Sequence, residues 1–598
     1  MKTSIFKYIT VAVAAGAMWL AGCNDLDQEP TNKFTDKAFW TSPERANMVL
    51  NMAYSQMYSH DKMFQDEALS DNMYEQRGNP DTRTIRTGQA TPNTSLFKSE
   101  WQWVFQGVKT CNIFLTFVDD VPGIESSNLA YMKAQIRFIR AFLYFRLACF
   151  YGDIPFFLND ISLEESRQMT RTSYVKVMEE LHRELDEIIP DLPKRDDLSA
   201  DDNGRITKAA AMVLKARMYL YENTSRTGNS VSDNMRKVAD ICDKLMHDQA
   251  TYGTYSLLTE GNEEGYLSPY EYLFTSGAEY NPEVILDYAA VELDKQWSLM
   301  YNMAPLSAGA NLCQKAPSKA LVDSYKMSDG SDPTDLNSYT GRDPRLKYTV
   351  AYNGMDWYDL NDKGEYVKKF TLNVTSGSDQ AGTANGSPTG FYTRKYFDPD
   401  HGKNLEMWTN FIMMRYADVL LMYAEAKAYL GELDVTVWNE TIRPIRMRAG
   451  VGGTEFPSAG DYTQIVRDER RGAGPGGSAL LRPDPLDQLQ GREVHGRCRT
   501  AQRSGLHVQR HADRPVQVRY GTRHPLVAAA FGDAARSVAA AQQLGILIVN
   551  QKHSEKDEKD IEYADGGRSC RLGRLLLERP GLRTGRGDSG QGVAAACR

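Results

Sequence analysis

The sequence predicts an all-α fold in which irregular, tetratricopeptide-like helical hairpins pack against a loop-rich part. Three observations lead to this prediction. Apolar residues recur at helical spacing in several segments. These segments follow one another in pairs, as successive αα-hairpins do. The stretches between the pairs are long and rich in Gly, Asn, Asp, Ser, Tyr and Trp.

The most apolar helix is expected within residues 131–157. Its apolar side chains form two stripes at helical spacing, which indicates a helix buried between neighbours on both faces. Gly152 and Pro155 should end it.

Further helical segments follow in chain order. They are expected at residues 172–190, 204–223, 233–247, 415–431 and 439–450. Small residues such as Ala209, Ala210 and Ala211 allow neighbouring helices to approach closely. Because no strict period of about 34 residues joins the pairs, the repeats are expected to be irregular.

The long connections are expected at residues 58–100, 250–312 and 351–410. Long loops in a compact domain commonly carry function. The net charge of -8 argues against nucleic acid as a main partner. The sequence contains no nucleophile motif and no cysteine or histidine spacing typical of a metal site, so we expect no cofactor.

The N-terminal segment, residues 1–22, is typical of a secretory signal, with Lys2 and Lys7 before an apolar run. The sequence Leu-Ala-Gly-Cys that ends at Cys23 resembles a bacterial lipobox. This resemblance implies cleavage before Cys23 and lipidation of its sulfur. The acidic residues after Cys23 resemble the surface-export signals of Bacteroidetes lipoproteins.

Several motifs, in this order behind the lipobox, resemble the SusD/RagB family of Bacteroidetes outer-membrane nutrient-binding lipoproteins. They are FTDKAFWTSPERANMVLNMAYSQM, RFIRAFLYFRLACFYGDIPFF, GRITKAAAMVLKARMYLYEN, NPEVILD, DGSDPTD, RDPRL, RYADVLLMYAEAKAYLG, IRPIRMRAGV and RDERR. The resemblance covers residues 23–471. It implies helical repeats packed against a loop-rich ligand-binding part, an outer-membrane, cell-surface location and a TonB-dependent SusC-like transporter as partner.

The chain changes character after residue 471. Residues 472–598 hold 17 Arg and 3 Lys against 8 Asp and 5 Glu, with no Trp or Met. Such a segment has little with which to build a core, so we expect it to be disordered or irregular. A disordered basic tail is one interpretation, and a change of reading frame is the other.

The second interpretation rests on alternative codons. Read one nucleotide later, Gly476–Asp487 can encode EGLRYYDLIRW, which resembles the family motif that follows RDERR. In the same frame, Leu526–Asp533 can encode WWPLPSE and Gln542–Val549 can encode NNSGYS followed by a stop. We therefore interpret residues 472–598 as an out-of-frame tail that truncates the family domain, with the frameshift near Arg471–Gly472.

Aromatic residues in the long connections are the candidate ligand contacts, because Tyr and Trp rings pack against the C–H faces of sugars. We predict Tyr74, Trp297, Tyr301, Trp357 and Tyr358 as ligand-binding residues. Core packing is the alternative for each of them.

Three functions fit these observations. The leading hypothesis is a non-catalytic surface protein that binds oligo- or polysaccharides and delivers them to the transporter. A peptide binder, as the RagB side of the family implies, is the alternative. A glycosidase is a third hypothesis, for which Asp71 with Glu75, or Asp356 with Asp359, would have to flank a sugar.

Overall fold

The computed structural model describes residues 34–35, 37–76, 80–458 and 460–472. The predicted signal segment 1–22, Cys23 and the predicted tail beyond Gly472 lie outside the described residues. Within the described ranges, none of the helices is both long enough and apolar enough to cross a bilayer.

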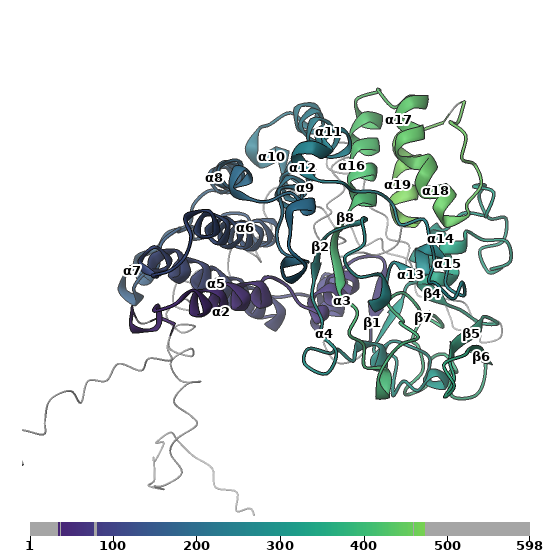
Figure 1. The fold of residues 1–598 in the computed structure, drawn as a ribbon. Helices are drawn as coiled ribbons and strands as arrows, with labels where there is room; N and C mark the ends of the chain where they lie inside the picture. Colours follow the sequence, from purple (N-terminus) through teal and green to yellow (C-terminus); the bar gives the residue numbers. More distant parts are fainter. Residues whose placement is uncertain (1–33, 36, 77–79, 459, 473–598) are drawn as a thin grey trace, which may run out of the picture. The chain divides into compact units, whose positions relative to one another are not determined.

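The long helices follow one another along the chain (Figure 1). They are α2 (Pro43–Met57), α5 (Ser95–Phe117), α6 (Ser126–Tyr151), α8 (Tyr174–Ile188), α9 (Lys208–Leu220), α11 (Val231–His247), α16 (Tyr416–Tyr429) and α19 (Tyr462–Gly472). Helix α2 packs on α5 and α6, α6 on α8, α9 on α11, and α11 on α16, which also contacts α19. This succession confirms the predicted all-α fold of irregular helical hairpins.

Helix α6 is buried on both faces, as its two apolar stripes predict. It ends at Tyr151, and the next residue, Gly152, has a φ of 71°. A left-handed backbone of this kind favours glycine, which explains why the helix stops there.

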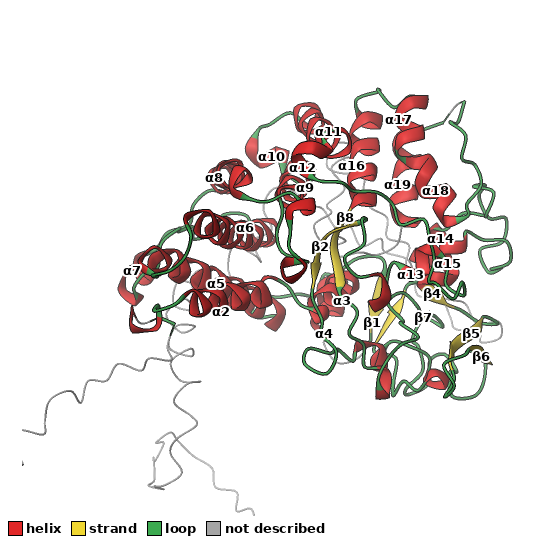
Figure 2. Cartoon of the chain, viewed as in Figure 1, coloured by secondary structure: helices red, strands yellow, loops and turns green. Residues whose placement is uncertain are grey.

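Short helices, small sheets and long loops make up the rest of the described chain (Figure 2). The short helices are α3 (His60–Leu69), α4 (Pro80–Arg86), α7 (Leu163–Gln168), α10 (Thr224–Thr227), α12 (Gln249–Tyr252), α13 (Pro269–Tyr272), α14 (Lys319–Ser324), α15 (Pro344–Thr349), α17 (Val435–Glu440) and α18 (Ile442–Ala449). The segment predicted as one helix at 439–450 is therefore divided between α17 and α18, with Thr441 at the junction.

The described strands form two-stranded antiparallel sheets. The pairs are β1 (Met73–Glu75) with β3 (Lys315–Pro317), β2 (Val284–Tyr288) with β8 (Phe411–Arg415), β4 (Val350–Ala351) with β7 (Tyr392–Thr393), and β5 (Asp356–Leu360) with β6 (Tyr366–Thr371). The β5–β6 pair is a local hairpin, whereas the other three join segments that are distant in the sequence.

The prediction of a loop at 58–100 is wrong, because α3, α4 and the start of α5 lie there. Helix α3 begins after Ser59, whose side chain accepts from the amide of Lys62. Its buried face includes Asp66 and Glu67 beside apolar residues. Charged residues on a buried face interrupt the apolar pattern by which a helix is recognised in a sequence.

Buried ion pairs tie the helices together. The Arg146 guanidinium of α6 forms two hydrogen bonds with Asp66 of α3 (2.7 and 2.8 Å) and one with Glu100 of α5 (3.0 Å). Near the end of the described chain, Glu469 of α19 accepts from Arg345 (2.6 Å). Two motifs of the sequence, RDPRL and RDERR, thus meet in one buried contact.

Candidate functional site

Three segments that are distant in the sequence meet beside the β1–β3 sheet. The amide of Gln76 donates to the carbonyl of Gln314 (3.2 Å), and the amide of Gln314 donates to the carbonyl of Asn302 (2.8 Å). The amide of Cys313 donates to the carbonyl of Asn385 (2.8 Å). The loop cluster is defined here as residues 73–76, 299–314 and 376–390.

Tyr74 lies at the centre of strand β1, opposite Ala316 of β3. Its neighbours Met73 and Glu75 are buried, while Tyr74 is half-buried. Successive side chains of a strand point to opposite faces. Tyr74 therefore points away from the core, on the face opposite to Glu75, whose carboxylate accepts from the Thr82 hydroxyl (2.7 Å).

Tyr301 lies in the 3-10 helix η7 (Leu299–Asn302) and is also half-buried. Its neighbour Met300 is fully buried and anchors this turn in the core. The carbonyl of Tyr301 accepts from the amide of Asn311 (3.0 Å). The structure thus places two of the predicted residues, Tyr74 and Tyr301, on adjoining segments of the loop cluster.

The surface of the loop cluster is uncharged. Its charged residues are Glu75 and Asp379 alone, and both are buried. The Asp379 carboxylate accepts from the amide of Ser307 (3.1 Å) and so holds the loops together. The exposed polar side chains of the cluster are Gln76, Ser307, Asn311, Ser376, Ser378 and Asn385. Amides and hydroxyls both donate and accept hydrogen bonds, which suits a neutral ligand rich in hydroxyl groups.

Tyr358 lies on the β5–β6 hairpin, and 38% of its surface is exposed. Its ring stacks on Tyr366 with centroids 5.6 Å apart, and Tyr366 stacks on Tyr266 at 4.3 Å. Arg394 donates to the Tyr366 hydroxyl (3.1 Å) and fixes the middle ring. The hairpin thus presents a second, rigid aromatic surface.

Trp297 and Trp357 are core residues, which corrects their prediction as ligand contacts. Trp297 is 5% exposed, its indole nitrogen donates to the carbonyl of Thr409 (3.0 Å), and its ring stacks on His60. Trp357 is 1% exposed and lies parallel to Phe370. Buried rings present no face to a sugar, so Tyr74, Tyr301 and Tyr358 remain as the predicted contacts.

Three of the four carboxylates considered for glycosidase chemistry, Asp356, Asp359 and Glu75, are engaged in structural contacts, whereas Asp71 is exposed. Asp356 pairs with Lys368 (2.8 Å), and Asp359 pairs with His401 (3.2 Å). Burial alone would lower the pKa of His401, but the hydrogen bond and charge of Asp359 raise it above its ordinary value. Glu75, from the other pair, is buried beneath the loop cluster. Across the described residues, no three His, Cys, Asp or Glu side chains are grouped to hold a metal ion.

The polar residues of the loop cluster were not predicted from the sequence. A usable signal was present, because residues 299–314 contain no charged residue in a chain that is 25% charged. The meeting of this run with residues 73–76 and 376–390 depends on the β1–β3 pairing and on loop hydrogen bonds. Neither has a periodic pattern that a sequence displays.

The fold and the loop cluster define a class of protein: a helical scaffold that carries an uncharged, tyrosine-bearing binding surface. Two family descriptions match this chain. "SusD family" matches residues 282–472, and "Starch-binding associating with outer membrane" matches residues 25–220.

Known proteins agree with these matches. SusD-like protein P38 of Formosa agariphila is 23% identical over 415 residues, which cover 68% of this chain and 75% of that protein. The starch-binding protein SusD of Bacteroides thetaiotaomicron is 30% identical over 128 residues, or 21% of each chain. A solved SusD-like carbohydrate-binding protein of Bacteroides fragilis superposes with a TM-score of 0.64 at 25% identity and covers 74% of this chain and 86% of its own. The chain belongs to the SusD family.

Proposed function

We propose that this protein is a cell-surface lipoprotein that binds a neutral oligo- or polysaccharide at the loop cluster and delivers it to a TonB-dependent, SusC-like transporter. The family supports glycan binding and an association with the outer membrane. The observation that carries the proposal for this chain is the uncharged surface of the loop cluster, with Tyr74 and Tyr301 on adjoining segments.

A pyranose ring has apolar C–H faces and a polar rim of hydroxyls. The tyrosine rings of the loop cluster would contact the faces. The amides of Gln76, Asn311 and Asn385 would exchange hydrogen bonds with the hydroxyls. A strongly acidic saccharide would find no exposed cation in the cluster, so a neutral glycan fits better.

We propose binding without hydrolysis. Glycoside hydrolysis needs two carboxyl groups about 5–10 Å apart on either side of the sugar. Glu75 and Asp379 are the acidic residues of the loop cluster, and both are buried in structural contacts. Retention of intact oligosaccharide after long incubation, with no new reducing ends, is the expected outcome.

The binding site is tested with Tyr74→Ala and Tyr301→Ala, and with a matched control. Each variant should lose roughly 1–3 kcal/mol of affinity for the bound glycan, a range taken from aromatic stacking on nucleic-acid bases. Tyr429→Ala is the control, because Tyr429 is a half-buried tyrosine at the end of α16. Calorimetric titration of a panel of neutral polysaccharides measures the change.

Unchanged glycan affinity in both loop-cluster variants would show that the glycan does not bind at the loop cluster. Binding of peptides, with no binding of any polysaccharide, would favour the RagB-like alternative instead.

The anchor is tested separately. Cys23→Ala should shift the protein from the membrane to the soluble fraction, because acyl chains on the sulfur are the proposed attachment and each buried methylene contributes about 0.8 kcal/mol. Membrane fractionation followed by immunoblotting measures the shift. Retention of the variant in the membrane fraction would contradict lipidation at Cys23.

A further inference from the structure

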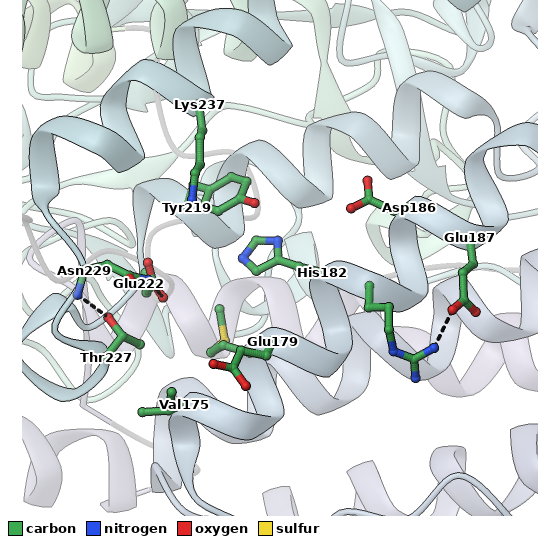
Figure 3. A pocket seen from close by; sticks show the side chains of 12 residues that line it. Val175, Glu179, His182, Asp186, Glu187, Tyr219, Glu222, Thr227, Asn229 and Lys237 are labelled. Atoms are coloured by element: carbon green, nitrogen blue, oxygen red, sulfur yellow. Dashed lines mark hydrogen bonds and ion pairs between the residues drawn. The ribbon is translucent and has the colours of Figure 1, made fainter.

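The helices carry a cavity of their own, distant in sequence from the loop cluster. It has a volume of about 570 Å³ and lies between α8, α9, α10 and the start of α11 (Figure 3). This volume falls within the range of about 300–1,000 Å³ that is typical of small-molecule sites. We refer to it as the helical groove.

A stacked pair of rings forms the middle of the helical groove. The imidazole of His182 on α8 lies parallel to the ring of Tyr219 on α9, with centroids 4.0 Å apart. The Lys237 ammonium of α11 lies over the Tyr219 ring at 4.7 Å from its centroid. Tyr219 is therefore held firmly in one position, and a rigid side chain loses little entropy when it binds a ligand.

His182 is an uncharged support for Tyr219. Burial, together with the ammonium groups of Lys215 and Lys237, lowers the pKa of His182 to about 3. Both ring nitrogens are buried, and neither forms a hydrogen bond with a residue that the structure describes. Such an arrangement costs stability, so folding alone gives no reason for a histidine at this position.

Polar groups without a hydrogen-bond or ion-pair partner among the described residues lie around the stacked rings. Figure 3 shows Lys237 and Tyr219 on one side of His182 and Glu179 on another. The Tyr219 hydroxyl, the Glu179 carboxylate and the Lys237 ammonium form no hydrogen bond or ion pair with a described residue. Together they supply donors and acceptors with no net charge.

Other carboxylates of the groove are already occupied. Glu222 accepts from the Asn229 amide (2.9 Å). Glu187 and Asp186 pair with Arg183 and Lys215. An anionic ligand would meet these carboxylates as well as Glu179, which disfavours acidic sugars and phosphorylated compounds.

We propose that the helical groove is a second glycan site, which binds a neutral disaccharide-sized unit. This inference rests on the proposed function in one respect: the ligand is taken to be a glycan. The sugar hydroxyls would bond Tyr219, Glu179 and Lys237, and an apolar sugar face would lie against Val175, which lines the groove. Two sites on one chain would hold a long glycan at separate points and raise its avidity.

The test uses the full chain and neutral disaccharides as probes: maltose, cellobiose, laminaribiose and β-1,4-mannobiose. Tyr219→Phe is the main variant, because it keeps the stacked ring and removes the hydroxyl. To silence the loop cluster, titrations are made in a Tyr74→Ala/Tyr301→Ala background. We expect at least one disaccharide to bind in this background and Tyr219→Phe to weaken that binding at least tenfold, with the melting temperature unchanged.

Val175→Trp places a large side chain in the groove and should weaken disaccharide binding as well. This second variant tests the groove independently of the Tyr219 hydroxyl. The matched control is Tyr429→Phe, which removes a hydroxyl elsewhere on the helices and should leave binding unchanged. Three results would overturn the proposal: no disaccharide binding in the silenced background, binding that both groove variants leave intact, or capture of dipeptides such as alanyl-lysine in place of sugars. None of these three results would contradict glycan binding at the loop cluster. That binding is tested separately with Tyr74→Ala and Tyr301→Ala in a chain whose helical groove is unchanged.

Discussion

The helices and the loop cluster are stabilised in different ways. Ion pairs between side chains, such as Arg146 with Asp66 and Glu100, join helices inside the core. In the loop cluster, the segments are joined by backbone bonds, as from Gln76 to Gln314, and by bonds to the buried carboxylates of Glu75 and Asp379. Backbone bonds do not depend on side-chain identity, so the surface residues of the loop cluster can change while its shape is kept. The buried charged side chains that join the helices cannot change in this way without loss of their ion pairs.

The largest expected effect comes from Arg146→Met. This change leaves Asp66 buried without its cation and leaves Glu100 with Lys62 alone. Breaking a buried pair in this way costs roughly 3–5 kcal/mol of unfolding free energy. Both carboxylates are nearly inaccessible, with side-chain exposures of 3% and 2%. Urea unfolding followed by circular dichroism measures the loss.

Arg183→Met is the matched control on α8. Its partners Glu180 and Glu187 are on the solvent side, and the Arg183 side chain is 52% exposed. Exposed pairs of this kind contribute little, so no measurable change is expected. Equal destabilisation by both variants would contradict the view that burial of the ion pairs holds the helices together.

The second prediction compares two neighbours on strand β5. Trp357→Ala removes a ring that is 1% exposed and should cost roughly 3–5 kcal/mol of unfolding free energy. Tyr358→Ala removes a ring that is 38% exposed and should change stability much less. Thermal unfolding of the two variants separates a core residue from a surface residue. Similar melting temperatures would show that the hairpin is not packed as described.

Much of the fold could be predicted from the sequence. The two apolar stripes of α6 predict burial on both faces, and Gly152 predicts its end, because both signals are local. Helix α3 could not be found in this way, since Asp66 and Glu67 interrupt its apolar face. The burial of Asp66 is explained by Arg146, which lies 80 residues away, and the Glu67 carboxylate accepts from the Asn72 amide (2.8 Å).

The candidate site was predicted less well, for a related reason. An aromatic residue in an irregular segment has no periodicity that reveals whether it is buried. Trp297 and Trp357 were therefore indistinguishable from Tyr74 until the partners of each ring were known. The polar residues beside Tyr74 come from loops whose meeting is set by long-range backbone bonds.

The third prediction concerns pH and the buried Asp287 on β2. Burial raises the pKa of Asp287 to about 7, although its carboxylate accepts a hydrogen bond from Asn410 (2.9 Å). The unfolded chain releases this proton near pH 3.9. The folded protein therefore holds the proton more tightly, and stability should fall as the pH rises from about 4 to about 7.

Asp287→Asn keeps an acceptor for Asn410 and removes the titrating group. The variant should lose less stability than the wild type between pH 4 and pH 7, as measured by melting temperatures across that range. A residual slope of the same sign is expected from Glu279, because burial raises the pKa of its carboxyl group to about 7 as well. Parallel profiles for the two proteins would show that Asp287 does not titrate in this window.

The smallest effect should come from Asn311, an exposed residue of the loop cluster. Two substitutions at this position distinguish the role of its side chain from the role of its backbone amide. Asn311→Ala removes an amide offered to the ligand and should weaken glycan binding by about 0.5–1.5 kcal/mol, while stability stays within about 0.5 kcal/mol. The backbone amide of residue 311 still donates to the carbonyl of Tyr301. Asn311→Pro removes that donor and should displace Tyr301, so its loss of affinity should be larger than that of Asn311→Ala. If Asn311→Ala impairs binding as much as Asn311→Pro, the side chains themselves hold the loop cluster in shape, and its contrast with the helices does not stand.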